Sequence, residues 1–196
     1  MPYSATHILV PIIFLELLRD DWPKASRFFS RKYTFLIGVA GALPDIDLHI
    51  YPIVEFLGKS FPITYLGHRI IFHNLWIPFG FLLFFFLFYY VIPHLNLRLK
   101  NLKRRKKLMV RFKKFGKVFL ILFIGWTIHL ILDAVLTGQV MPFYPLNTYI
   151  VDYDLIGRIE NATGVTKQTI LVSMDALLLF FWLWHEETHR YIKDYF

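Results

Sequence analysis

A histidine and an aspartate stand four residues apart within an apolar stretch, at His129 and Asp133. Positions i and i+4 share one face of a helix, so the two side chains can reach a single metal ion. The alternative is a hydrogen-bonded pair that braces a helical bundle, because ionisable groups in such a stretch must face protein or water rather than lipid. The spacing makes this pair the first candidate for metal chemistry.

Two other segments carry residues of the same kind. Asp45 and Asp47 follow Pro44, where two carboxylates could bind or flank a divalent cation, although a turn that ends a helix has the same composition. His68 and His73 lie before a long apolar run. On an ideal helix they would diverge by about 140°, so both can point inward only if a helix begins between them. Taken alone, they could also be histidines at a membrane interface.

The elements that must position these residues are membrane-spanning helices. The 196 residues are 56% hydrophobic, with a mean hydropathy of +0.47, which favours a bilayer over water as the solvent. We therefore expect an all-α, polytopic helical bundle that forms a single membrane-embedded domain over residues 1–196. The apolar runs predict three full spans, Leu75–Ile92, Val118–Leu136 and Ile170–Trp184, and two shorter helices, Ile8–Leu18 and Tyr33–Pro44.

Positive charge predicts the orientation of this bundle. Half of the 22 Lys and Arg residues fall within 94–117, which we expect to be a basic cytoplasmic loop that attracts anionic lipids. Nucleic acid is not expected as a partner, because no aromatic platform interleaves the densest part of this segment. The basic segment Arg19–Lys32 should lie on the same side. Residues 139–168 then form an external loop of a multi-pass inner-membrane protein.

This orientation brings all of the candidate residues to the outer membrane face, although only lysines and arginines were used to derive it. Clustered imidazoles and carboxylates suit a hydrolytic centre, in which a shared carboxylate bridges two or three metal ions that activate water. Because the chain has no cysteine, the ligands must be nitrogen and oxygen atoms. The candidate ligands are His7, Asp45, Asp47, His68, His73, His129 and Asp133.

The order of these motifs resembles that of the YdjM-type membrane-bound metal-dependent hydrolases. That family is similar in motif order to zinc-dependent phospholipase C and related single-strand nucleases, which are helical enzymes that cleave phosphodiesters with clustered zinc ions. The resemblance rests on Thr6-His7, Gly41 to Asp47, His68-Arg69 with His73, His129 with Leu132-Asp133, Thr137-Gly138 and Pro142-Phe143. It implies metal ligands at His7, Asp45, His68 or His73, His129 and Asp133, with Asp47 as a ligand or a base.

Two further features have competing interpretations. Arg69 could hold a phosphate oxygen beside the cluster, or could extend to lipid head groups. His185, Glu186 and His189 fit the HExxH pattern of zinc peptidases, although a third ligand would have to come from upstream in the chain. The predicted topology puts this pattern at the cytoplasmic end, where charged helix ends are common, and away from the other ligands.

The sequence thus predicts a membrane-embedded hydrolase with a divalent metal cofactor, expected to be two or three zinc ions. The metal would activate a water molecule, which would then attack a phosphoester. The resemblance suggests a lipid head group or a lipid-linked phosphate as substrate, with Asp47 and Arg69 as catalytic residues. A metal or proton transporter would use buried His and Asp residues equally well. An intramembrane HExxH zinc peptidase is the third hypothesis, and the oligomeric state stays open.

Overall fold

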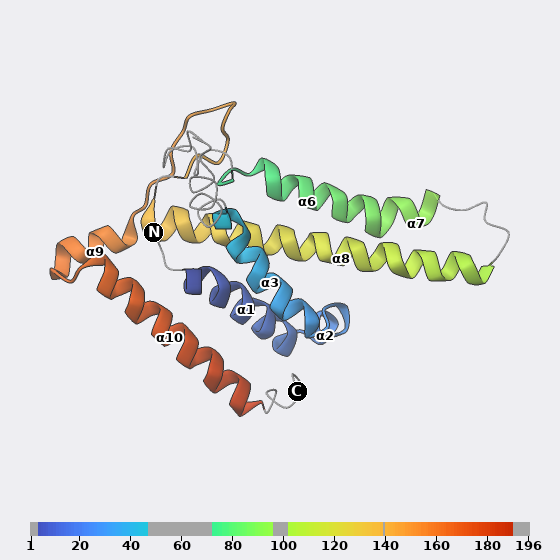
Figure 1. Cartoon of the computed structure of the whole chain (residues 1–196), viewed down its shortest axis with the longest axis horizontal. Helices are drawn as coiled ribbons and strands as arrows, with labels where there is room; N and C mark the ends of the chain where they lie inside the picture. Colours follow the sequence, from blue (N-terminus) through green and yellow to red (C-terminus); the bar gives the residue numbers. More distant parts are fainter. Residues whose placement is uncertain (1–3, 47–71, 96–101, 139, 190–196) are drawn as a thin grey trace, which may run out of the picture.

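The computed structural model describes residues 4–46, 72–95, 102–138 and 140–189. Within these ranges the chain is mostly helical, and its only extended pairing is an isolated bridge between Val140 and Val151. Figure 1 shows long helices that pack along one another without a sheet. The elements are α1 (Ser4–Asp21), α2 (Pro23–Phe28), α3 (Lys32–Ala42), η1 (Leu43–Asp45), α6 (Trp76–Phe86), η2 (Leu87–Val91), α7 (Ile92–Leu95), α8 (Leu102–Leu132), η3 (Asp133–Thr137), α9 (Leu155–Thr163) and α10 (Lys167–Thr188).

Three helical stretches in the described part are long and apolar enough to cross a membrane, which confirms the predicted all-α membrane bundle. They are Trp76–Leu95, Lys106–Thr137 and Lys167–Thr188. The first consists of α6, the π-helix η2 and α7, and the second continues from α8 through η3. Most of α10 faces outward with large apolar side chains such as Leu177 and Phe180, as contact with lipid requires.

Helix α8 corrects the expected basic loop. It begins at Leu102 and runs for 31 residues, so most of the segment 94–117 is helix rather than loop. Lysine and arginine are good helix formers, and a helix that extends beyond the hydrocarbon core keeps these charges in water while its backbone stays hydrogen-bonded. Residues 96–101, which connect α7 to α8, lie outside the described part.

The expected external loop, residues 139–168, also contains a helix. α9 begins after Asp154, whose side chain accepts a hydrogen bond from the Gly157 N–H at 3.1 Å. α9 packs against η3 and α10 through a small core of Leu136, Ile156 and Leu171. This segment is therefore folded onto the ends of two spans rather than open.

The two shorter helices lie at the centre of the bundle. α1 covers 18 residues and is longer than the predicted range of Ile8–Leu18. Both α1 and α3 pack against α8, and Leu15, Ile37 and Ile121 from the three helices meet with no exposed surface. This packing also removes Glu16, in the last turns of α1, from lipid, because its exposed fraction is 2%.

The helix directions define two ends of the bundle. α3 and α8 finish at the end where α1 and α6 begin, and the basic first turns of α8 lie at the opposite end (Figure 1). α1 and α10 run in the same direction, because Thr6 contacts Asp175 near their starts and Asp20 contacts His185 near their ends. The first of these two ends collects η1, the turn before α6 and η3.

Candidate metal centre

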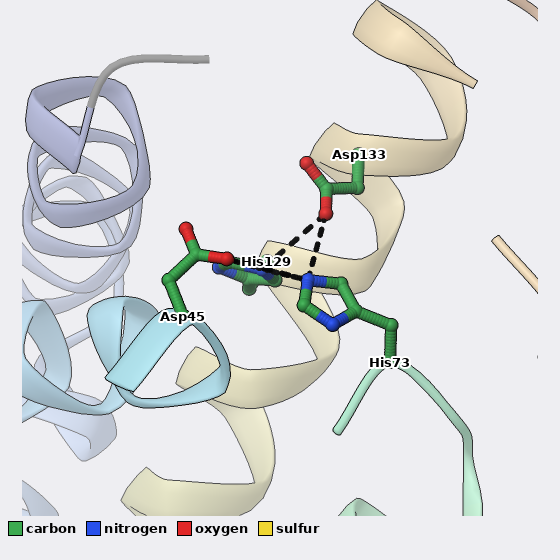
Figure 2. Close-up of side chains that lie close together, drawn as sticks. All are labelled: Asp45, His73, His129 and Asp133. Carbon is green, nitrogen blue, oxygen red and sulfur yellow. Dashed lines mark hydrogen bonds and ion pairs between the residues drawn. The ribbon is translucent and has the colours of Figure 1, made fainter. Parts of the chain in front are cut away.

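Four side chains converge at the end of the bundle that lies opposite the basic residues. Asp45 ends η1, His73 precedes α6, His129 lies in the last turn of α8 and Asp133 begins η3. One ligand atom from each lies within 4.8 Å of the other three. Figure 2 shows the two imidazoles and the Asp133 carboxylate directed at a common centre, which the Asp45 carboxylate approaches from η1. We call these four residues the tetrad.

The spacing of the tetrad atoms suits a tetrahedral metal ion. His73 Nε2 lies 2.9 Å from both His129 Nε2 and Asp133 Oδ2. Asp45 Oδ1 lies 3.4 Å from His73 Nε2 and 3.6 Å from His129 Nε2. Tetrahedral zinc with nitrogen and oxygen ligands at normal bond lengths places neighbouring ligand atoms about 3.3 Å apart. Both the donor atoms and their distances therefore fit a divalent ion such as zinc.

A backbone carbonyl sets the tautomer of His129. Its Nδ1 lies 2.7 Å from the carbonyl oxygen of Gly41, and because that oxygen can only accept, Nδ1 carries the proton. The lone pair is then on Nε2, the atom that faces His73 and Asp133. Metal-binding histidines in proteins commonly donate their other N–H in this way, which fixes the ring and increases its basicity.

Gly41 is also the point at which α3 approaches α1 most tightly. A Cβ atom on Gly41 would lie 2.1 Å from the carbonyl oxygen of His7, so no other residue fits there without a shift. Pro11 has no N–H to bond this carbonyl, which leaves it open on the face of α1. The close contact of the two helices brings His7 beside His129, where the rings stack with centroids 3.9 Å apart.

Local hydrogen bonds hold His73 in place before α6. The Asn74 side chain accepts from the Trp76 N–H at 3.1 Å, and Trp126 Nε1 on α8 donates to the Phe72 carbonyl at 3.0 Å. The turn is thus tied to α6 and α8 at once. Burial lowers the pKa of His73, but hydrogen bonds to Asp133 and Asp45 outweigh burial and raise that pKa to about 9. The two carboxylates therefore favour a cation at this position.

His7 extends the cluster beyond the tetrad. It is fully buried, and its Nε2 lies 3.4 Å from Asp133 Oδ1, the oxygen that points away from His73. Neither ring nitrogen of His7 has a hydrogen-bond partner among the described residues. Buried polar atoms without partners are rare and call for a water, an ion or another group. Asp133 thus presents one oxygen to the tetrad and the other to His7.

The π-helix η3 determines how the chain leaves Asp133. Gly138 follows η3 with φ of 73°, and its N–H donates to the Asp133 carbonyl at 2.8 Å. A Cβ atom on Gly138 would lie 1.8 Å from Asp152 Oδ1, so both the backbone angle and the available space require glycine. Single π-helical turns are uncommon and occur frequently at functional sites.

The model of the YdjM inner membrane protein family matches residues 1–190. The chain belongs to the YdjM inner membrane protein family. The match confirms the resemblance seen in the motif order, and with the three spans it places the protein in the inner membrane. No curated protein and no solved structure matches the chain significantly.

The predicted site residues of this YdjM family member fall into two groups. Five of the seven predicted ligands lie together: His7, Asp45, His73, His129 and Asp133. Asp47, His68 and Arg69 lie outside the described residues, so their roles stay predictions. His73 precedes α6 rather than lying within it, so the ideal-helix argument about its direction does not apply.

Other parts of the YdjM site carry no clear sequence signal. The Gly41 carbonyl is a backbone atom, and no side chain indicates its hydrogen bond to His129. The Thr6 hydroxyl donates to the Asp175 carboxylate and so positions the first turn of α1, which carries His7. Asp175 could have been found, because a carboxylate inside a predicted span must face protein or water.

His185 and His189 do not join this cluster. His185 Nε2 lies 3.2 Å from Asp20 Oδ2, near the other end of α1. Thirteen residues separate His7 from Asp20, which corresponds to about 20 Å along the helix. The predicted separation of the HExxH pattern from the other ligands therefore agrees with the structure.

Proposed function

We propose that the protein is a membrane-embedded, metal-dependent hydrolase of phosphoesters. The observation that supports this function best is the tetrad, which collects two imidazoles and two carboxylates at distances that suit zinc. Zinc bound there would supply Lewis-acid activation of water and of a phosphoryl oxygen. Asp45, with 15% of its side chain exposed, is the most accessible member of the tetrad and marks the side from which substrate would approach.

The two oxygens of Asp133 support a centre with more than one ion. Oδ2 faces His73 and His129, and Oδ1 faces Nε2 of His7 at 3.4 Å. A carboxylate that bridges two ions presents its oxygens in this manner. We assign His7 to a second ion and Asp133 to the position shared by the two ions, and the roles of Asp47 and His68, which lie outside the described residues, stay predictions.

A lipid head group or a lipid-linked phosphate is the proposed substrate class. The segment after η3 lies beside the site, because the N–H of Leu75, just before α6, donates to the Pro142 carbonyl. This segment also exposes large side chains. Aromatic residues concentrate at the boundary between membrane and water, so this segment suits the depth of lipid head groups. Its exposed members are Phe143, Leu146, Tyr149, Ile150 and Tyr153. Arg69 would hold a phosphate oxygen bidentately.

Metal content and turnover of one variant pair test this function. The full chain is purified in detergent, stripped with a chelator, reloaded with zinc and assayed with bis-(p-nitrophenyl) phosphate and with phospholipid micelles. Asp133→Asn should lose the zinc held by the tetrad and should lower turnover by more than the roughly 100-fold that outer-shell substitutions cause. Asp21→Asn replaces an exposed aspartate at the far end of α1 and should leave both measurements unchanged.

Zinc binding without turnover of any phosphoester would contradict the hydrolase. The transport hypothesis instead predicts no phosphoester turnover. Reconstituted vesicles would then take up zinc or protons, and Asp133→Asn would abolish the uptake. Hydrolysis that is unchanged in Asp133→Asn would reject the tetrad as the catalytic centre.

A further inference from the structure

A second group of ionisable side chains lies where α1 and α10 end together. Asp20 and Glu16 come from α1, and His185, Glu186 and His189 come from α10 and the residue after it. Asp20, His185 and His189 each place one ligand atom within 4.8 Å of the other two, and Glu16, His185 and Glu186 do the same. His185 belongs to both groups and is 7% exposed.

Burial makes this group costly without a cation. The exposed fraction of Glu16 is 2% and that of Glu186 is 1%, and the two carboxyl groups lie close enough to share a hydrogen bond. Two buried carboxyl groups close together cannot both carry charge cheaply. Arg31 acts on Glu186 electrostatically and offsets part of the charge. Asp20, 19% exposed at its side chain, remains as a third carboxylate beside His185.

The histidines have the geometry of metal ligands. His185 and His189 are four residues apart on one face, and their ring centroids are 4.4 Å apart. His189 Nδ1 lies 3.0 Å from the carbonyl oxygen of His185, so Nδ1 donates and the lone pair is on Nε2. His185 directs Nε2 at Asp20, at 3.2 Å. Two imidazoles with one carboxylate are a common three-residue ligand set for zinc.

We propose that His185, His189 and Asp20 form a second metal site, which binds a divalent transition ion such as zinc and joins α10 to α1. The buried Glu186 and Glu16 carboxylates add negative charge beside the ion. The site lies about 20 Å along α1 from His7, so it is separate from the tetrad. Because α10 contacts lipid over most of its length, this cross-link would hold its end against the bundle.

Zinc counting in a chain without the first site tests the proposal. In the double variant His129→Ala/Asp133→Asn, purified in detergent and reloaded with zinc, we expect about one zinc ion per chain to remain. Adding His189→Ala should remove it. His189 is exposed, so this substitution has little effect on folding, and His94→Ala, at another exposed histidine, is its control. A double variant that holds no zinc, or that keeps it after His189→Ala, overturns the second site.

Two matched pairs of neighbours make the test independent of folding. Asp20→Asn should lose the ion while Asp21→Asn, next to it and exposed, keeps it. Glu186→Gln should weaken zinc binding about 10- to 100-fold, as outer-shell substitutions do, while the exposed Glu187→Gln has no effect. Cobalt(II) in place of zinc gives a visible absorption that reports nitrogen ligation directly. Equal cobalt spectra for Asp20→Asn and Asp21→Asn would reject the assignment, whatever the hydrolase assay shows.

Discussion

At the scale of single residues, the candidate centre depends on backbone positions as much as on its ligands. Gly41 has two roles, since its carbonyl orients His129 and its missing side chain lets α3 approach His7. The first role uses a backbone atom that every residue has, whereas the second requires the absence of a Cβ atom. The ligand geometry is therefore sensitive to a position that itself binds nothing.

Substitution of Gly41 by alanine should disturb the site and the fold together. The added Cβ would meet the His7 carbonyl at 2.1 Å, and relieving such an overlap in a packed interior costs about 1–3 kcal/mol. We expect a lower thermal unfolding temperature in detergent and a loss of bound zinc. Gly80→Ala in α6 is the matched control, because no atom lies within 4 Å of its added Cβ. It should stabilise the helix by up to about 1 kcal/mol. Equal unfolding temperatures for the two variants would contradict the close contact.

At the scale of elements, the apolar pattern predicted which segments form spans better than it predicted the residues at which these helices begin and end. α10 begins three residues before the predicted Ile170 and ends four residues after Trp184, because charged and polar residues continue the helix into water. The same effect, over a longer distance, extends α8 back to Leu102. Hydropathy detects the part of a helix that lies in lipid, whereas helix propensity and packing determine where the helix stops.

The non-α elements at the site could not have been predicted from pattern. The hydrogen bonds of η1 span one residue fewer than those of an α-helix, and those of the π-helix η3 span one residue more. Apolar periodicity does not record this difference. The second cluster shows a related limit. Glu16 is visible as an ionisable residue within an apolar helix, but its neighbour Glu186 lies 170 residues later, and only the packing of α1 against α10 brings them together.

The start of α9 provides a test of one element outside the membrane. Asp154 accepts from the Gly157 N–H and lies 3.0 Å from Lys167 Nζ, and the pairing with Lys167 is the main reason why its pKa is below the ordinary value. A folded-state pKa below that of the unfolded chain means that the charged carboxylate stabilises α9 above about pH 4. This contribution is lost as pH falls through the lowered pKa.

Hydrogen exchange of the α9 amides should follow this dependence. At neutral pH we expect faster exchange in Asp154→Ala than in the native chain, by the roughly fivefold that a cap of about 1 kcal/mol provides. The difference should shrink in acid, where the carboxyl group is protonated. Asp154→Asn keeps a capping side chain that tolerates the left-handed backbone, where φ is 36°, but loses the charge that pairs with Lys167, so at neutral pH it should lie between the native chain and Asp154→Ala. A difference between Asp154→Ala and the native chain that does not change with pH would rule out the charged cap.

At the scale of the whole molecule, the bundle keeps its basic helical turns apart from the candidate metal centre. The basic turns of α8 are at one end and the tetrad is at the other. The positive-inside bias then predicts that the tetrad lies at the outer face of the inner membrane. Substrate would reach the site from the periplasmic side, and lipid in the outer leaflet of that membrane would lie at the correct depth.

Labelling of single introduced cysteines can determine this orientation, because the native chain has no cysteine. Tyr149→Cys, at a position that is 62% exposed near the site, should react with a membrane-impermeant maleimide in intact spheroplasts. Lys107→Cys, exposed on α8, should react only after the membrane is opened. The reverse labelling pattern would place the site in the cytoplasm and would exclude substrates of the outer leaflet.

The contact between Thr6 and Asp175 joins two residues that are 169 positions apart. The first turn of α1, which carries His7, therefore finds its partner only after α10 has been synthesised and inserted. Before that point Thr6 lacks the Asp175 carboxylate, whereas the other residues of the cluster, up to Asp133, have already been synthesised. We therefore expect the first turn of α1, and His7 with it, to be fixed in the site only after the last helix has packed against α1. His7 is therefore synthesised long before the helix that fixes its position has packed against α1.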